Sequence, residues 1–340
     1  MHKLTKKLAS GGEWNIFEEL GFLGNLLILL VALFALNQTS NLTIKHSVKI
    51  AGATGLGKAT VGFVLVAFST SLPELFVAIF AIMEPENVGI SIGNVLGSNI
   101  ANIGLVLGTI FVLIAMKYSE NAKFLPAMVK EETRDLHFAL LVASVIPLGL
   151  LYIGSASQLI GISLLLIFSY NIYRISKTRT TIPGPPLEGE KNELKKYILM
   201  AVLGSAGVVA SSYFIVESGS YLATSVGVPK VIIGATIVAI GTSLPELVTS
   251  IDAIKKGHAD LALGNIVGSC FMNITLILGV TLVAAPFSVE IAIFTNLIIF
   301  SLVANVFLSY FLSNEKIGWK EGAVLLLIYA TFLLTSINTT

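Results

Sequence analysis

The chain has 340 residues, of which 55% are hydrophobic and 12% charged, and its formal net charge is +1. Because soluble domains carry charge on about a quarter of their residues, this composition and the mean hydropathy of +0.87 exclude an ordinary soluble fold and indicate a membrane protein. The near-zero net charge gives no sign of a nucleic-acid partner, and the single cysteine, Cys270, excludes an intrachain disulfide.

Apolar runs that could cross a hydrocarbon core of about 30 Å as helices recur along the chain. The first follows Lys3, Lys6 and Lys7, and because no small-residue cleavage site comes after it, we interpret it as a helix rather than a signal peptide. A hydrophilic linker with prolines and glycines, residues 176–195, divides the runs into two groups of five. The expected spans lie near residues 15–37, 59–83, 88–116, 136–153, 156–175, 196–216, 230–255, 260–284, 287–312 and 319–337.

Two segments, one in each half, have nearly the same sequence. Residues 58–108 contain KATVGFVLVAFSTSLPELFVAIFAI and then GNVLGSNIANIGLVLG, and residues 230–279 contain KVIIGATIVAIGTSLPELVTSIDAI and then GNIVGSCFMNITLILG. An odd number of spans in each half inserts the second copy upside down relative to the first. We therefore expect an all-α polytopic membrane protein of about ten transmembrane helices, in two inverted five-helix halves at 1–175 and 196–340.

The distribution of basic residues indicates an orientation. With the N-terminus outside, the inner loops and the linker hold most of the Lys and Arg residues, as the positive-inside rule requires of cytoplasmic loops. Lys3, Lys6, Lys7 and Lys230 would lie outside. We expect a multi-pass protein of the cell membrane, with a cytoplasmic linker and both termini extracellular.

Each repeat places one glutamate, Glu74 or Glu246, at membrane depth. A carboxylate there costs roughly 2.5 to 3.5 kcal/mol on insertion scales, so it indicates function by default. Neither repeat has a basic residue between its first lysine and the end of its glutamate helix, which argues against a buried ion pair. Pro73 and Pro245 lie next to these glutamates, and because proline has no N–H, we expect both helices to distort and free backbone carbonyls.

The spacing of polar residues brings more oxygen atoms to the same place. Residues three or four apart share a helix face, so Thr70 and Ser71 are expected to converge with Glu74. The next helix has Ser98 and Asn102 four residues apart. The second repeat doubles this set, and such all-oxygen ligands are what hard cations, above all Ca2+, prefer.

Other chemistry is not indicated by the sequence. The four histidines, His2, His46, His137 and His258, are scattered and form no zinc motif. No glycine-rich phosphate loop is present, so ion movement by this chain would use an existing gradient rather than ATP. An intramembrane hydrolase using Ser71 or Ser243 would need a base, and no histidine lies near either serine. We therefore do not expect an enzyme; a channel remains conceivable.

The repeated motifs, STSLPEL with GNVLGSNIAN and GTSLPEL with GNIVGSCFMN, resemble the alpha-repeats of the Ca2+/cation antiporter superfamily, specifically of prokaryotic sodium/calcium exchangers. The resemblance implies ten helices, with ion sites among the repeat helices and two long, tilted helices, near 15–37 and 196–216, that slide across them. It implies electrogenic antiport of Na+ against Ca2+. The implied partners are these ions and the lipid bilayer, with no cofactor and no obligate protein partner.

The resemblance also implies a ligand set. Glu74 and Glu246 would bind both ions, the threonines would offer carbonyls or hydroxyls, the serines would line flanking Na+ sites, the alanines would offer main-chain carbonyls, and the asparagines would complete the middle of the cluster. The remaining members are Thr70, Thr242, Ser71, Ser243, Ser98, Ser269, Ala67, Ala239, Asn102 and Asn273.

Two departures and one rival interpretation qualify this resemblance. Potassium-dependent relatives have an aspartate where this chain has Asn273, so we expect no K+ cotransport. Ser69 stands where the second repeat has Gly241, which predicts that the first helix breaks less readily than the second.

The rival interpretation is a Ca2+/H+ exchanger of the same fold, whose members place an acidic residue soon after the Gly-Asn of the second motif. Here Asn94 is followed by Val-Leu-Gly-Ser, which favours Na+.

Overall fold

The computed structural model describes residues 16–54, 66–83, 88–117, 130–153, 155–177, 193–225, 239–284, 287–288, 291–313 and 318–338. The predicted linker lies largely outside the described residues, as do the N-terminal lysines and the first residues of both repeats.

In the first half, the described elements are α2 (Ile16–Thr54), α4 (Ala67–Thr70), α5 (Leu72–Met83), α6 (Val88–Ile100), the π-helix η3 (Ala101–Leu107), α7 (Gly108–Lys117), α8 (Lys130–Ile153), the strand β1 (Ser155–Ala156) and α9 (Gln158–Lys177). In the second half, they are α11 (Leu194–Ser225), α13 (Ala239–Lys255), α14 (Ala259–Met272), the π-helix η6 (Asn273–Ile277), α15 (Leu278–Ala284), the strand β2 (Phe287–Ser288), α16 (Ile291–Ser313) and α17 (Trp319–Asn338).

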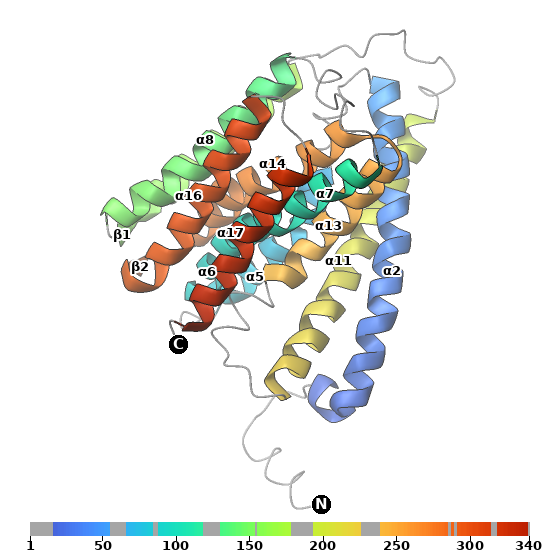
Figure 1. Ribbon diagram of the computed structural model, residues 1–340, viewed down its shortest axis with the longest axis horizontal. Helices are drawn as coiled ribbons and strands as arrows, with labels where there is room; N and C mark the ends of the chain where they lie inside the picture. The colour runs from blue at the N-terminus through green and yellow to red at the C-terminus, as the bar shows by residue number, and fades with distance from the viewer. Residues whose placement is uncertain are drawn as a thin grey trace, which may run out of the picture.

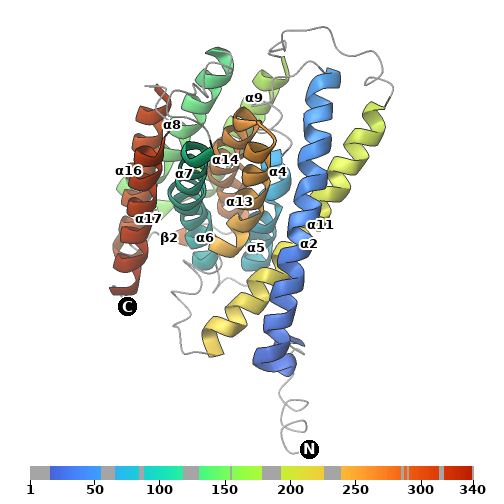
Figure 2. The ribbon, with the colours of Figure 1, turned by 45° about the vertical axis from the view of Figure 1, so that its right-hand side comes forward.

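The helices form a bundle with a repeat-built centre and two outer edges. The repeat helices α5, α6, α7, α13 and α14 lie in the middle, α8 and α16 form one edge, and α2 and α11 form the other (Figure 1). The two strands pair antiparallel, with Ser155 opposite Ser288, at the edge formed by α8 and α16. In a second view, α2 and α11 again lie side by side, crossing along their length (Figure 2).

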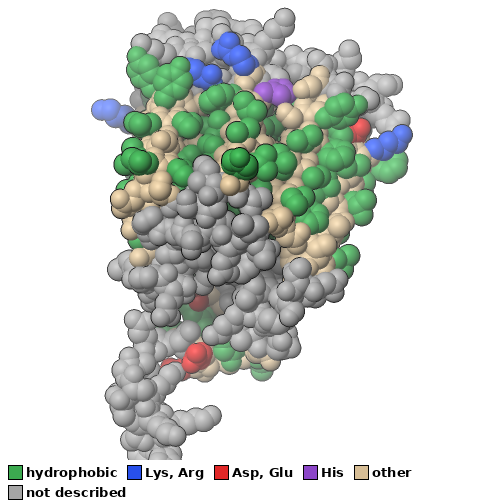
Figure 3. Space-filling view, turned by 90° about the vertical axis from the view of Figure 1, so that its left-hand side faces the viewer, with side chains coloured by type: hydrophobic (Ala, Val, Ile, Leu, Met, Phe, Trp, Pro, Cys, Tyr) green, Lys and Arg blue, Asp and Glu red, His purple; other side chains and the backbone are tan. Residues whose placement is uncertain are grey.

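The surface and the core both have the character of a membrane protein. Large hydrophobic side chains such as Leu23, Leu159 and Leu327 are more than 60% exposed, and hydrophobic side chains cover much of the described surface on the α8 and α16 side (Figure 3). Six described helices are long and apolar enough to cross a membrane, judged by length and composition. The expectation of ten spans stays a prediction.

The outer helices α2 and α11 are longer than the sequence predicted. The span expected at 15–37 is a 39-residue helix, interrupted only by Gly21 with φ 62°, and the span expected at 196–216 is a 32-residue helix. The prediction ended the first helix at its polar residues, but Ser40, Thr43 and Ser47 are buried because they face protein rather than lipid. At about 1.5 Å per residue, each helix exceeds the thickness of a bilayer core.

The two prolines act differently, which corrects one expectation. In the first repeat the helix breaks at Ser71 (φ −85°, ψ 5°), two residues before Pro73, which has no N–H to donate to the carbonyl of Ser69. In the second repeat, α13 continues through Pro245. The prediction that Ser69 would make the first break the less permissive one is therefore wrong, since a helix can pass a proline when its neighbours hold it in place.

Two π-helical segments were not predicted. The expected spans at 88–116 and 260–284 each change from α to π geometry in the middle, at Ala101 and at Asn273. A π segment adds a residue to one turn and turns the following side chains around the helix axis, and such segments often occur at functional sites. The two segments begin at or beside Asn102 and Asn273, which are matching positions of the two repeats.

Close glycine contacts hold repeat helices against their neighbours. A Cβ added at Gly322 of α17 would lie 2.7 Å from the carbonyl oxygen of Gly108, and a Cβ added at Gly161 of α9 would lie 2.9 Å from that of Gly279. Gly108 and Gly279 are matching residues of the two repeats. Each repeat thus packs a helix of the other half by the same small-residue contact, as is common between membrane helices.

We predict that Gly322→Val destabilises the protein, because a larger side chain would force α17 away from α7. The melting temperature of the purified protein in detergent, followed by size-exclusion chromatography after heating, should fall by about 5 °C or more. Gly93→Ala is the matched control, since a Cβ at Gly93 would contact nothing within 4 Å. Equal melting temperatures for Gly322→Val and the wild type would show that this contact does not matter.

Candidate functional site

The two glutamates of the repeats lie inside the bundle and are completely buried. Glu74 is in the first turn of α5 and Glu246 is in α13, and neither side chain is exposed at all. Among the described residues, neither carboxylate forms an ion pair with a Lys, Arg or His side chain. Without a counter-charge from the described residues, both side chains are costly to keep in an ionised form unless a ligand is bound.

Glu246 lies at the end of a chain of hydrogen bonds that joins the two repeats. The hydroxyl of Ser269 on α14 donates to Glu246 Oε1 at 2.9 Å. Ser71, at the break between α4 and α5, lies 2.6 Å from Ser269 Oγ and 3.4 Å from Glu246 Oε1. Asn102 Nδ2 of η3 also donates to Ser269 Oγ at 3.2 Å. Ser71 was expected beside Glu74, but its contact is with the glutamate of the other repeat.

Glu74 has a different environment. Neither of its carboxylate oxygens has a hydrogen-bond partner among the described residues. The hydroxyls of Ser98 and Thr242 lie 3.2 Å apart, and Thr242 also donates to Asn94 Oδ1 at 3.3 Å. Thr242 and Ser98 are the residues of the second and first repeats that correspond to Thr70 and Ser269 on the Glu246 side. The site therefore consists of two related halves, each built from both repeats.

Several buried oxygen atoms of the predicted site have no partner among the described residues. They are both carboxylate oxygens of Glu74, Oε2 of Glu246, Oδ1 of Asn102 and of Asn273, and Oγ of Ser243. Buried polar atoms are almost always hydrogen-bonded, so a group of unpaired oxygens inside one bundle requires an explanation. Cations supply one, because carboxylate, amide and hydroxyl oxygens are ligands of Na+ and Ca2+.

The two main-chain carbonyl oxygens of the predicted ligand set already accept hydrogen bonds within the protein. The carbonyl oxygen of Ala67 accepts hydrogen bonds from the backbone N–H of Ser71 at 2.9 Å and from Thr70 Oγ1 at 3.3 Å. The carbonyl oxygen of Ala239 accepts from Thr242 Oγ1 at 3.3 Å. Each carbonyl thus accepts a hydrogen bond from the hydroxyl of a predicted threonine ligand. That these carbonyls bind the ion directly stays a prediction.

Sequence reasoning missed three asparagines of the site. Asn94 and Asn265 accept hydrogen bonds from Thr242 and Thr70, and Asn99 Oδ1 accepts from Asn273 Nδ2 at 3.0 Å. Two of them could have been found, because each repeat has polar residues at every fourth position, on one helix face. These rows are Asn94, Ser98 and Asn102 in the first repeat, and Asn265, Ser269 and Asn273 in the second.

The side chains of the predicted site all offer oxygen atoms as possible ligands for a cation. Among the described residues, no three His, Cys, Asp or Glu side chains come together. Cys270 is buried beside the site, where it packs in the largest hydrophobic cluster. Two carboxylates with neutral oxygens suit hard cations rather than zinc or copper.

Comparison with known proteins agrees with this chemistry. The family model described as sodium/calcium exchanger protein matches residues 24–177 and 196–338. The sodium/calcium exchanger MaX1 of Methanosarcina acetivorans is 33% identical over 91% of this chain and 97% of its own length. A structure of the sodium–calcium exchanger NCX_Mj is 25% identical, covers 92% of this chain and 98% of its own, and superposes with a TM-score of 0.75.

Long apolar helices around a buried group of oxygen atoms define a multi-pass membrane protein of the ion-transporter class. The chain belongs to the family of sodium/calcium exchanger proteins.

We predict that Glu74→Gln stabilises the ion-free protein, because it removes a buried charge that has no partner among the described residues. At pH 8 in chelator and without Na+, the melting temperature should rise by about 5 °C. Glu321→Gln, a carboxylate at the first turn of α17, should leave it unchanged. A lower melting temperature for Glu74→Gln would mean that the carboxylate is stabilised by contacts within the protein.

Proposed function

We propose that this chain is a secondary antiporter that exchanges Na+ for Ca2+ across the membrane by alternating access. The observation that carries the proposal is that Glu74 is fully buried and that neither of its carboxylate oxygens has a partner in the described part of the chain. Glu246, the matching glutamate of the second repeat, is also fully buried. The exchangers MaX1 and NCX_Mj, to which the chain is similar, support the identity of the two ions.

The charge of the site gives a physical rule for exchange. Two carboxylates are neutralised by one Ca2+ or overfilled by three or more Na+, and either load crosses the low-dielectric core more cheaply than the bare dianion. A filled site therefore permits the conformational change and an empty one blocks it. When three Na+ exchange for one Ca2+, one net charge moves, so we propose electrogenic transport with Na+ flowing in and Ca2+ out.

The ligands in this proposal are those predicted from the repeats, with Glu74 and Glu246 shared by both ions. Hydrogen bonds between the repeats support their convergence, notably Ser71 with Ser269 and Ser98 with Thr242. We further propose that the site has two carboxylates rather than three, because residue 273 is an asparagine and not an aspartate. This disfavours K+ as a cotransported ion.

The architecture we propose has ten helices in two inverted halves, 1–175 and 196–340, with repeats at 58–108 and 230–279 and a cytoplasmic linker at 176–195. The matching glycine contacts and the matching π segments support it. Long helices α2 and α11 would slide across the repeat helices. A Cβ added at Gly204 of α11 would lie 2.6 Å from Thr43 Oγ1 of α2, so this pair is packed closely enough to move together.

The test of function is radiolabelled Ca2+ uptake into Na+-loaded proteoliposomes, with K+-loaded and pH-gradient controls. Wild-type uptake should require the outward Na+ gradient and increase at inside-positive potential, because net positive charge leaves. Glu74→Ala and Glu246→Ala should reduce uptake to background, whereas Glu321→Ala should retain it. Uptake driven by a pH gradient alone would favour the Ca2+/H+ alternative, and activity in both alanine variants would refute the site.

The proposed orientation is tested by labelling introduced cysteines in intact cells with a membrane-impermeant maleimide. Thr340→Cys, at the C-terminus, should react in intact cells, while Gly189→Cys, in the linker, should react only after permeabilisation. The native chain is the unlabelled control, because Cys270 is fully buried. The opposite pattern would reverse the orientation.

A further inference from the structure

The side-chain amide of Asn265 forms hydrogen bonds with three other buried side chains. Its Oδ1 accepts a hydrogen bond from Thr70 Oγ1 at 3.1 Å, and its Nδ2 donates to Thr249 Oγ1 at 3.1 Å and to Ser250 Oγ at 3.0 Å. All these side chains are buried. Thr249 and Ser250 follow Glu246 by three and four residues, so they lie on the same face of α13 as the glutamate.

The direction of these hydrogen bonds is fixed by Thr249. Its hydroxyl donates to the carbonyl oxygen of Pro245 at 2.7 Å, so it can only accept from Asn265. A reversed amide would place Oδ1 against an oxygen that has no hydrogen to give. Asn265 Oδ1 therefore faces Thr70. It lies 3.1 Å from Thr70 Oγ1, against 3.3 Å for the carbonyl oxygen of Ala67, so the single hydroxyl hydrogen of Thr70 points to these two acceptors and leaves the lone pairs of Thr70 Oγ1 for a cation.

The corresponding asparagine of the first repeat lacks this support. Asn94 Oδ1 accepts from Thr242 Oγ1 at 3.3 Å, but its buried Nδ2 has no partner among the described residues. The reason is visible in the repeat alignment: Val77 and Ala78 occupy the positions of Thr249 and Ser250, and neither carries a hydroxyl. Among the described residues, no hydrogen bond to Nδ2 orients the amide of Asn94, so Asn94 constrains the Thr242 hydroxyl less than Asn265 constrains that of Thr70.

We propose that Thr249 and Ser250 are positioning residues that orient Thr70, through Asn265, for Na+ binding on the Glu246 side of the site, while the Glu74 side adapts to its ion. This inference rests on the proposed function. An oriented oxygen needs no rearrangement when the ion arrives. A monovalent ion depends more on neutral oxygens than Ca2+ does, because the attraction of Ca2+ to the two carboxylates is stronger. Loss of the orientation should therefore weaken Na+ binding more than Ca2+ binding.

The test measures ion affinity without transport, from the rise in melting temperature of the purified, full-length protein as Na+ or Ca2+ is added. In the double variant Thr249→Val with Ser250→Ala, which copies the first repeat, the apparent Kd for Na+ should increase about tenfold, as expected when one buried hydrogen bond is lost. The Kd for Ca2+ should change by less than about threefold. Thr249→Ser keeps the acceptor and should behave as the wild type.

A reciprocal variant keeps the test decisive if the first one is unstable. Val77→Thr with Ala78→Ser offers acceptors to Asn94 Nδ2 and should lower the Kd for Na+ by about threefold. Equal weakening of Na+ and Ca2+ binding, or a fall in ion-free melting temperature with unchanged affinities, would show that Thr249 and Ser250 have only a structural role. Failure of the wild type to exchange ions in proteoliposomes would refute the proposed function instead, and would leave these binding results interpretable.

Discussion

The structure depends on two carboxylates held in a place where no basic side chain neutralises them. Glu74 and Glu246 are fully buried. Among the described residues, the hydroxyls of Ser71 and Ser269 contact Glu246, the oxygens of Glu74 have no partner, and neither carboxylate is paired with a positive charge. Keeping such groups inside a membrane bundle has a large free-energy cost, which a bound cation offsets. The helix break at Ser71 places a hydroxyl 3.4 Å from Glu246 Oε1, and Asn102, in the π segment η3, donates to the hydroxyl of Ser269, which itself donates to that oxygen.

The duplicated sequence allows the residues of the site to be predicted. Repetition predicted Glu74, Thr70, Ser98 and their counterparts as site residues without a structure, because ionisable side chains at membrane depth are rare enough to stand out. It could not show which repeat supplies which partner. Ser71 contacts Glu246 rather than Glu74, since the two repeats interlock and neighbours in space are distant in sequence.

Helix geometry was predicted less well than residue identity. The first span was ended at its polar residues, yet α2 continues to Thr54 because those residues face α11 and α13 rather than lipid. The effect of proline also depended on context, with a break before Pro73 and none at Pro245. Hydropathy measures the affinity of a segment for lipid, and it carries no information on contacts between helices.

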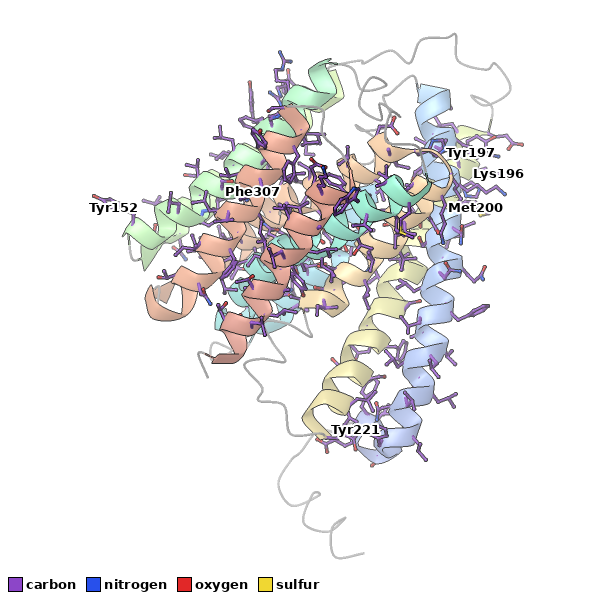
Figure 4. The ribbon with its side chains drawn as sticks, in the orientation of Figure 1. Tyr152, Lys196, Tyr197, Met200, Tyr221 and Phe307 are labelled. Atoms are coloured by element: carbon purple, nitrogen blue, oxygen red, sulfur yellow. The ribbon has the colours of Figure 1, made fainter. Side chains whose placement is uncertain are left out.

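The two-stranded pairing at Ser155 and Ser288 has a mechanical consequence. It joins the halves of the chain by backbone hydrogen bonds at the edge formed by α8 and α16 (Figure 1). At the opposite edge, α11 contributes no described residue to the two largest hydrophobic clusters, and Tyr197 packs with Ile50 of α2, well apart from Tyr221 at the other end of α11 (Figure 4). The edge at α8 and α16 is thus cross-linked by backbone hydrogen bonds. At the other edge, α2 and α11 pack on α13 through a small cluster, in which Leu36 and Val208 contact Leu244 and Val248, so thermal fluctuations should be concentrated in α2 and α11.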